Sequence, residues 1–269
     1  MKYSTVMGAA LPEREWVPSP MYILRRAAIL DWLQGMPTGR VIEFGCGPGA
    51  LLHDLSKLGF HGIGVERSPT SLELSRDLLR DAMNFKVVPN TDGITAESAD
   101  YLFSFEVLEH IENDAEALRM WLTFLKPGGS VLISVPAHSH RWNLTDVNAG
   151  HFRRYDRPDV IELLQAADLV IERIGTYGWP ASRMIEYIRE RTTNSSMNRA
   201  GETASNIEVG DPEKTMASGF NRKIETRFFK YYGSWLGQIL FMVAARMQRF
   251  FYRTDLGVSF IVHAKKPNA

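Results

Sequence analysis

Short apolar runs alternate along this chain with segments in which apolar residues recur every three or four positions. Runs of the first kind predict buried strands, at residues 41–44, 61–65, 85–88, 100–105 and 130–135. Segments of the second kind predict helices, at residues 21–34, 50–58, 69–81, 114–125, 159–167 and 181–191. This alternation predicts an α/β fold with a mostly parallel, doubly wound sheet, whose ligands bind at the C-terminal ends of the strands.

The last third of the chain departs from this alternation. Further strands are predicted at residues 170–175 and 257–265, and the weakly hydrophobic residues 192–215 predict a mobile linker or the tip of a lid. Residues 224–252 carry aromatic and aliphatic side chains at helical spacing, flanked by Arg and Lys. They form either a lid or dimer helix packed on the core, or an apolar pocket or membrane-surface contact. We divide the chain into an N-terminal segment and helix, a cofactor-binding core, a helical lid and a last core strand, at residues 1–40, 41–180, 181–255 and 256–269.

Three alternating glycines follow the first predicted strand. Gly45, Gly47 and Gly49 predict a tight turn into a helix, because glycine adopts φ > 0 and lets a ligand approach the backbone closely. Glu66 ends the second strand, where an acid hydrogen-bonds a ribose diol in nucleotide-binding βαβ units. Glu43 lies inside an otherwise apolar strand, and a buried charge needs a partner. Together these residues predict a nucleotide-derived cofactor, and at this point a nicotinamide or flavin stays open.

Composition narrows the class of protein. Thirty-one Lys and Arg balance thirty-one Asp and Glu, so the chain lacks the electrostatic footprint of nucleic-acid binding. The single cysteine, Cys46, excludes an internal disulfide and a multi-cysteine metal site. The first twenty residues lack a secretory-signal pattern, and no apolar run is long enough to span a bilayer. We therefore expect a cytoplasmic protein without a nucleic-acid partner. For the predicted helix 21–34 we expect Arg25 and Arg26 to be exposed.

The motifs resemble those of class I methyltransferases that use S-adenosylmethionine, over most of residues 41–135 and the final strand. Glu43-x-Gly45-x-Gly47-x-Gly49 resembles the first motif of that family, and Glu66 resembles its ribose-binding acid. Residues 100–110 resemble the fourth-strand motif F-D-x-V-x-x-x-x-V-L-E-H, and residues 125–129 resemble the turn before the fifth strand. The resemblance implies a Rossmann-like seven-stranded sheet with an antiparallel last strand and a helical insertion before it.

The same resemblance implies S-adenosylmethionine as the cofactor and S-adenosylhomocysteine as its product. The cofactor contacts that it implies are Glu43, Gly45, Cys46, Gly47, Gly49, Glu66, Arg67, Asn90, Thr91, Asp92, Phe105 and Glu106. The loop after the third strand departs from the family pattern of an acid followed by a small residue. The resemblance implies that one of Asn90, Thr91 and Asp92 takes that place against the adenine.

A second stretch, Asp146-x-x-x-Gly150-His151-x-Arg153-Arg154-Tyr155, resembles a sequence in a subset of bacterial class I methyltransferases that act on envelope glycans, lipids or other small molecules. It implies a small-molecule acceptor, anionic or apolar. The residues expected to bind it are Arg153, Arg154, His138 and Tyr22. The two arginines either grip an anionic acceptor or form salt bridges that hold the lid.

Methyl transfer from a sulfonium is an in-line displacement, so the protein has to position the acceptor and take up a proton. His110, His151 and Tyr155 are the candidate bases. No metal-ligand spacing stands out, so we expect no metal. The sequence thus predicts transfer to an O, N or C atom of a small molecule, with a homodimer left open. An NAD(P)-dependent oxidoreductase and a non-catalytic subunit that binds the cofactor are the alternatives.

Overall fold

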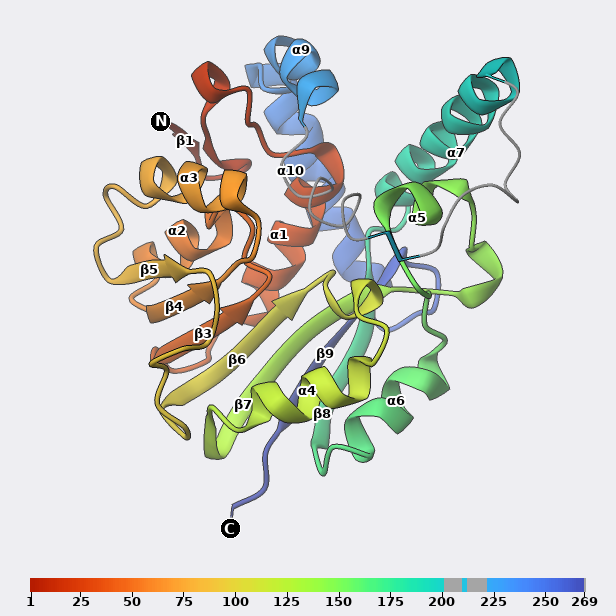
Figure 1. Cartoon of the computed structure of the whole chain (residues 1–269). Coiled ribbons are helices and arrows are strands. Elements are labelled where there is room, and N and C mark those ends of the chain that lie inside the picture. Colours follow the sequence, from red (N-terminus) through yellow and green to blue (C-terminus); the bar gives the residue numbers. More distant parts are fainter. Residues whose placement is uncertain (201–209, 212–221, 269) are drawn as a thin grey trace.

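The core of the protein is a seven-stranded sheet (Figure 1) in a computed structural model that describes residues 1–200, 210–211 and 222–268. The strands, in sheet order, are β5 (Phe85–Val88), β4 (His61–Val65), β3 (Arg40–Phe44), β6 (Ala99–Phe105), β7 (Leu125–Pro136), β9 (Ser259–Lys265) and β8 (Val170–Tyr177). Strand β9 pairs antiparallel with β7 and β8, while the other neighbouring strands are parallel. This order confirms the predicted fold class, with β3, beside the middle strand β6, leading into the glycine loop.

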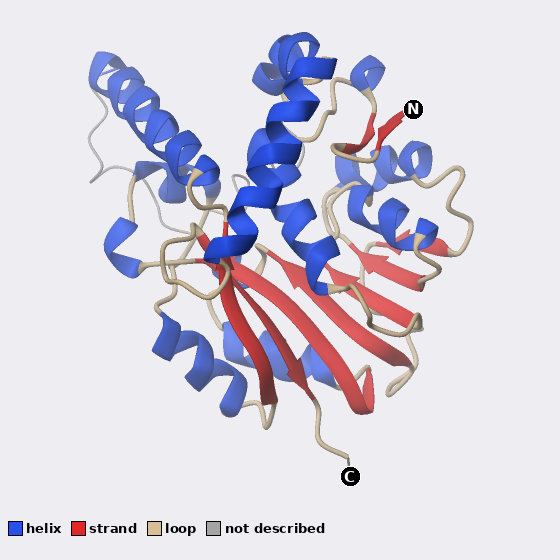
Figure 2. Cartoon of the chain, turned by 180° about the vertical axis from the view of Figure 1, so that it is seen from behind, coloured by secondary structure: helices blue, strands red, loops and turns tan. Residues whose placement is uncertain are grey.

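Helices cover both faces of this sheet (Figure 2). One face carries α1 (Pro20–Trp32) and α2 (Ala50–Lys57), with α3 (Pro69–Leu78) packed against α2. The other face carries α4 (Asp114–Leu122) and α6 (Arg157–Gln165). The apolar stripe of α2 puts Leu52 and Leu55 into the first core, and Leu118 and Trp121 of α4 fill the second. The two packed cores hold the strand ends, and therefore the loops that follow them, in fixed positions.

The N-terminal segment contains regular secondary structure before α1. It forms the antiparallel pair β1 (Lys2–Ser4) and β2 (Gly8–Ala10), followed by the 3-10 helix η1 (Pro12–Arg14). The expectation that Arg26 is exposed is wrong, because it is buried against α2. Its Nε and Nη2 donate to the two carboxylate oxygens of Asp54 at 2.6 and 2.7 Å. Arg25 is half-buried and faces the opposite way, toward the strand ends.

The remaining short elements lie in the loops after β6 and β7. They are the 3-10 helices η2 (Leu108–His110) and η3 (Ser139–Arg141), and α5 (Leu144–Ala149). Helix α7 (Ala181–Ala200) runs nine residues further than predicted, so the first part of the expected linker is helical. The rest of that linker lies outside the described residues, apart from Gly210 and Asp211.

The predicted helix over 224–252 is three elements. Helix α9 (Lys223–Tyr232) ends at Gly233, Ser234 caps the start of α10 (Trp235–Gln248), and η5 (Arg249–Phe251) follows. The prediction that its aromatic stripe packs on the core is wrong for most of these side chains. Trp235, for example, is 77% exposed, and Phe250 is 84% exposed. Among the described residues, no helix combines the length and the apolar character needed to cross a membrane.

Candidate active site

The glycine loop joins the end of β3 to the start of α2. Gly45, Gly47 and Gly49 all have positive φ, at 67°, 55° and 80°, and Gly49 is the N-cap of α2. A Cβ on Gly45 would lie 2.4 Å from Val107 Cγ2, so that position admits only glycine. The turn leaves backbone N–H groups at a helix N-terminus, which suits an anionic group. Cys46 is buried, and burial raises the pKa of its thiol well above the usual value, so it acts as a small packing residue.

Glu66 connects this loop to the next helix. One carboxylate oxygen accepts the backbone N–H of Gly47 at 2.9 Å, and the other accepts the N–H of Ser68 at 2.8 Å. Ser68 in turn caps α3. The acid therefore lies at the ends of two adjacent parallel strands, beside the glycine loop.

Glu43 lies beneath the loop, with only 4% of its surface exposed. Its Oε2 has no hydrogen-bond partner. Burial raises the pKa of Glu43 to about 8; the positive charge of Arg25 opposes this shift and the negative charge of Glu66 adds to it. A buried carboxyl with an unused oxygen is costly unless a ligand supplies the partner.

Glu106 follows β6 and adopts φ 59°, a left-handed conformation unusual for a residue with a side chain. Its carboxylate accepts hydrogen bonds from three hydroxyl groups, one each on β7, β8 and β9. They belong to Ser134 at 2.8 Å, Tyr177 at 3.0 Å and Ser259 at 3.2 Å. Although burial lowers it, electrostatic interactions with Tyr177 and Glu106 hold the pKa of Arg25 above its usual value. The end of β6 therefore carries the carboxylate of Glu106, which these hydrogen bonds hold in place and which interacts with the guanidinium of Arg25 on α1.

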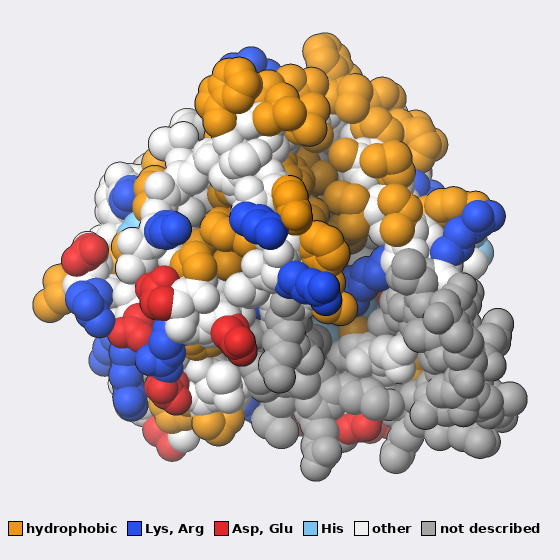
Figure 3. Space-filling view, turned by 90° about the horizontal axis from the view of Figure 1, so that it is seen from above, with side chains coloured by type: hydrophobic (Ala, Val, Ile, Leu, Met, Phe, Trp, Pro, Cys, Tyr) orange, Lys and Arg blue, Asp and Glu red, His pale blue; other side chains and the backbone are white. Residues whose placement is uncertain are grey.

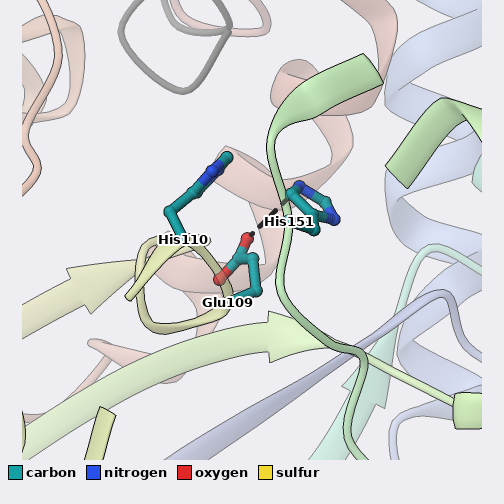
Figure 4. A group of neighbouring side chains, drawn as sticks. All are labelled: Glu109, His110 and His151. Atoms are coloured by element: carbon teal, nitrogen blue, oxygen red, sulfur yellow. Dashed lines mark ion pairs between the residues drawn. The ribbon is translucent and has the colours of Figure 1, made fainter. Parts of the chain in front are cut away.

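Glu109, His110 and His151 form a cluster just beyond this strand end (Figure 4). Nδ1 of His151 lies 3.0 Å from Asp146 Oδ1, and Nδ1 of His110 lies 3.3 Å from the carbonyl oxygen of Gly150. Burial and the charge of His151 lower the pKa of His110 to about 3, so its ring is neutral near pH 7. Burial, together with the negative charge of Glu106, raises the pKa of Glu109 well above its usual value.

A family model described as a methyltransferase domain matches residues 22–174, which is more than half of the chain. The chain belongs to this methyltransferase family. The match spans the glycine loop, Glu66, the end of β6 and the cluster around His151. Membership decides against the nicotinamide oxidoreductase alternative.

Curated relatives of this methyltransferase-family chain include two proteins named ubiquinone biosynthesis O-methyltransferase. The protein from Cupriavidus pinatubonensis is 28% identical over 131 residues, covering 46% of this chain and 51% of the relative. The protein from Ralstonia nicotianae is 31% identical over 116 residues, covering 39% and 48%. This chain thus spans about half the length of the curated relatives it matches.

Solved structures resemble this family member in fold. The [4+2]-cyclase SpnF has a TM-score of 0.58 at 15% identity, with 99% of this chain and 88% of that chain covered. The phosphoethanolamine N-methyltransferase 2 of Haemonchus contortus, in complex with S-adenosyl-L-methionine, has a TM-score of 0.54 at 18% identity, covering 91% and 52%. An S-adenosylmethionine-dependent methyltransferase from Mesorhizobium loti has a TM-score of 0.53 at 14% identity, covering 92% and 98%. At these identities the likeness shows the fold alone, and a cyclase among the neighbours illustrates that one fold hosts different reactions.

The expected substrate role of Arg154 is not supported in this methyltransferase-family chain. Its guanidinium is buried and donates to Asp146 at 2.9 Å and to Glu186 on α7 at 2.7 Å. The alternative, salt bridges that hold the helical segment, describes it better. Arg153 forms a different ion pair, in which its Nη1 lies 3.0 Å from Oδ2 of Asp114.

The surroundings of Tyr155 also suit a structural role and do not suit a general base. Its buried hydroxyl donates to Asp114 Oδ2 at 2.7 Å. Burial and this hydrogen bond raise the pKa of Tyr155 far above its usual value, so the hydroxyl stays protonated. His110 and His151 are therefore the two candidate bases that the fold brings together, with ring centroids 4.7 Å apart.

The other predicted residues fall into two groups. Tyr22 on α1 packs near Ala50 at the start of α2: its buried hydroxyl has no partner, and its ring lies 5.5 Å from the Arg25 guanidinium. Arg67 and Asn90, Thr91 and Asp92 follow β4 and β5, beside Glu66, whose N–H donates to the carbonyl of Val88. His138, by contrast, neighbours His140 and Phe260 rather than His110.

Sequence reasoning missed Arg25, Glu109 and Asp146 as parts of this site. Arg25 was missed because an amphipathic pattern does not say which polar side chains of a helix turn inward. Asp146 lies five residues before His151 in a motif already noted, so that spacing was its available signal. Tyr177 was missed because its partner, Glu106, lies 71 residues away.

Proposed function

We propose that this chain is an S-adenosylmethionine-dependent methyltransferase that acts on a hydroxyl group of a small molecule. The observation that carries the proposal is Glu43, a buried carboxyl beneath the glycine loop whose Oε2 lacks a partner. A nicotinamide dinucleotide has no group that needs an acid there. The methionine part of S-adenosylmethionine has an ammonium group, which would satisfy it.

The residues present fit that cofactor at both ends. Glu66 accepts two backbone N–H groups, and a ribose diol can replace that of Gly47 at the same oxygen. The N–H groups of the glycine loop suit the cofactor's carboxylate. Phe105, with Asn90, Thr91 and Asp92 at the neighbouring strand ends, would border the adenosine. When bound, the cofactor supplies a methyl group on a sulfonium, which is an activated leaving group.

The chain's own residues then have to position the acceptor and handle its proton. Glu106 and Arg25 form a polar floor at the end of β6, and the cluster of Glu109, His110 and His151 lies just beyond it. Proton removal is needed for a hydroxyl acceptor, and this cluster offers nitrogen and carboxylate atoms for it. The name O-methyltransferase, borne by the curated relatives, supports oxygen as the acceptor atom.

We further propose that the exposed face of α9 and α10, defined by Phe228, Trp235 and Leu240 on these helices and by Phe250 on η5 directly after them, docks on an anionic membrane surface. These side chains are 51%, 77%, 62% and 84% exposed, and Figure 3 shows hydrophobic side chains gathered on this side with Lys and Arg among them. Residues 222–253 contain seven Lys and Arg and one Glu, a net charge of +6, whereas the whole chain is neutral. Aromatic side chains among cations are typical of helices at the headgroup boundary.

Such docking would bring an apolar acceptor close to the site. Gln248 of α10 donates to the carbonyl of Leu24 on α1 at 3.0 Å and accepts the N–H of Gly178 at 3.0 Å. The docking face is thus tied to the helix that carries Tyr22 and Arg25. A lipid-type small molecule and a cytoplasmic location both agree with this arrangement.

Methyl transfer is tested by incubating the full chain with S-adenosylmethionine and acceptors grouped by chemistry: phenols and catechols, the same rings bearing a prenyl chain, and matched amines. Release of S-adenosylhomocysteine is followed by mass spectrometry, with Glu66→Ala as the control at limiting cofactor. Release that depends on a hydroxyl-bearing acceptor is expected. Transfer to amines alone would contradict the oxygen acceptor, and no release with any class would contradict the transferase.

A further inference from the structure

The cluster of Glu109, His110 and His151 has the geometry of a metal site. One donor atom from each of the three side chains lies within 4.8 Å of the other two. Two of the donors come from η2, at the end of β6, and the third comes from the loop after α5. In Figure 4 the Glu109 carboxylate points toward the ring of His151, and His110 projects from the same turn as Glu109.

Both histidines are oriented by a second residue. The Nδ1 atom of His151 is held by the carboxylate of Asp146 at 3.0 Å, and the Nδ1 atom of His110 by the carbonyl of Gly150 at 3.3 Å. Because a carbonyl and a carboxylate both accept hydrogen bonds, each Nδ1 carries the proton. Each Nε2 therefore keeps its lone pair. Metal-binding histidines almost always show this arrangement, in which the other nitrogen donates to a carboxylate or backbone carbonyl.

Glu109 supplies the independent observation. Its side chain is 0% exposed, and neither carboxylate oxygen has a hydrogen-bond partner. Its Oε1 lies 4.0 Å from Nε2 of His151, too far for a hydrogen bond. Two metal–ligand bonds of about 2.0–2.2 Å each, as formed by Zn²⁺ with histidine and carboxylate, can bridge that separation.

We propose that Glu109, His110 and His151 bind one divalent transition-metal ion, with Asp146 as a positioning residue. Two histidines and one carboxylate are a donor set that Zn²⁺ takes in catalytic sites with an open fourth position, and that non-haem Fe²⁺ also takes. This proposal revises the expectation that the chain uses no metal. That expectation rested on sequence spacing, which does not bring residues 109 and 151 together.

A second group of possible donors, His138, His140 and Asp156, is less suited to a metal. Asp156 already accepts the N–H of Ser139 at 3.1 Å and is engaged by the Ser139 hydroxyl. It also belongs to the capping box of α6. Its oxygens are thus in use, unlike those of Glu109. This group provides a matched control.

The role of the ion rests on the proposed function. A hydroxyl group of the acceptor placed at the open position would ionise at a lower pH, since a bound cation stabilises the negative oxygen. The O–H bond breaks, the electron pair stays on the oxygen and the proton passes to water, because the nitrogen and carboxylate atoms of the cluster, which could otherwise accept it, are bound to the ion. The oxygen that is left is the nucleophile that a methyl acceptor needs.

Binding is tested without cofactor or acceptor, on the full chain free of any histidine tag. Equilibrium dialysis against Zn²⁺ should give one ion per chain, and Co²⁺ should give a visible absorption band on binding. Glu109→Gln and His151→Asn should each weaken Zn²⁺ binding at least tenfold, and Asp146→Asn by about 10–100-fold. His140→Asn, which removes only the second group, should leave both readouts unchanged. Circular dichroism checks that each variant is folded.

Three results would overturn the inference: no Zn²⁺ or Co²⁺ bound by the folded wild type, unchanged binding in Glu109→Gln, or loss of binding in His140→Asn. Full acceptor-dependent activity after removal of the metal by a chelator would overturn the role of the ion. Because dialysis needs no cofactor, its failure is distinct from failure of the methyltransferase proposal. A chain that binds S-adenosylhomocysteine but no Zn²⁺ would retain the proposed function and lose the metal.

Discussion

Asp146 and Arg154 form a buried ion pair in which the arginine Nε lies 2.9 Å from both carboxylate oxygens. The same guanidinium reaches Glu186 on α7, and the same aspartate orients His151. One pair therefore links α7 to the ring of His151. Although burial alone would raise it, the hydrogen bond from His151 and the charge of Arg154 lower the pKa of Asp146.

Replacing Arg154 by methionine should destabilise the protein strongly. The substitution removes the arginine partner of the buried Asp146 and one of the two arginines that contact Glu186, which keeps Arg183 at 3.0 Å. Breaking a buried pair in this way typically costs about 3–5 kcal/mol. Arg153→Met is the matched control, because its pair with Asp114 involves a side chain that is 35% exposed and should contribute at most about 1 kcal/mol. Denaturant unfolding of both variants measures the difference, and equal losses would contradict this account of Arg154.

Cofactor binding should expel a proton from Glu43. Burial raises the pKa of this carboxyl from 4.5 to about 8, so it is protonated in the free protein at pH 7. An ammonium group beside it favours the ionised form, so binding lowers the pKa and releases the proton. Affinity should accordingly increase as the pH rises from 6 to 8, and level off above that.

Calorimetry of S-adenosylhomocysteine binding at pH 7, in two buffers of different ionisation enthalpy, counts the protons released. Wild type should release close to one proton. Glu43→Gln has the same shape but cannot ionise, and it should release none from this position. If both proteins release the same number, Glu43 does not hold the ammonium.

The exposed face of α9 and α10 should bind anionic vesicles. The full chain should sediment with phosphatidylglycerol vesicles and much less with phosphatidylcholine, and added salt should weaken the binding. Trp235→Ser together with Phe250→Ser should reduce vesicle binding more than tenfold, since each large apolar side chain contributes roughly 1.5–3 kcal/mol when buried.

Met83→Ser is the control for this prediction, because Met83 is 90% exposed but lies between α3 and β5. It should bind vesicles like wild type. The rival occupant of the face is a second copy of the chain. A dimer in sedimentation analysis that the Trp235 and Phe250 substitutions dissociate, without vesicle binding by wild type, would replace the membrane with that interface.

Much of the fold follows from the sequence, because local patterns encode it. The five apolar runs and the glycine loop predicted the strands around β3, and all of them are present. The break between α9 and α10 at Gly233 and Ser234 was not predicted, although glycine followed by a serine cap is a known signal. The extension of α7 was missed because a polar composition suggested a linker.

The candidate site was only partly predictable, because several residues that meet in it lie far apart along the chain. Glu43, Glu66 and the glycines form one local motif, so spacing reveals them. Arg154 carries a charge that suits an anionic ligand equally well, and only the positions of Asp146 and Glu186 show that it is already paired. Glu109 was passed over because nothing in its local sequence says that it is buried without a partner.

The central claim is tested most directly by calorimetric titration of the purified chain with S-adenosylmethionine and S-adenosylhomocysteine, repeated on Glu66→Ala. We predict binding with a dissociation constant on the order of micromolar, weakened in the variant by about 1–3 kcal/mol, the usual effect of losing a hydrogen bond to a charged group. The variant must retain the circular dichroism of wild type. Absence of binding of either ligand by the folded wild type would contradict the proposed function.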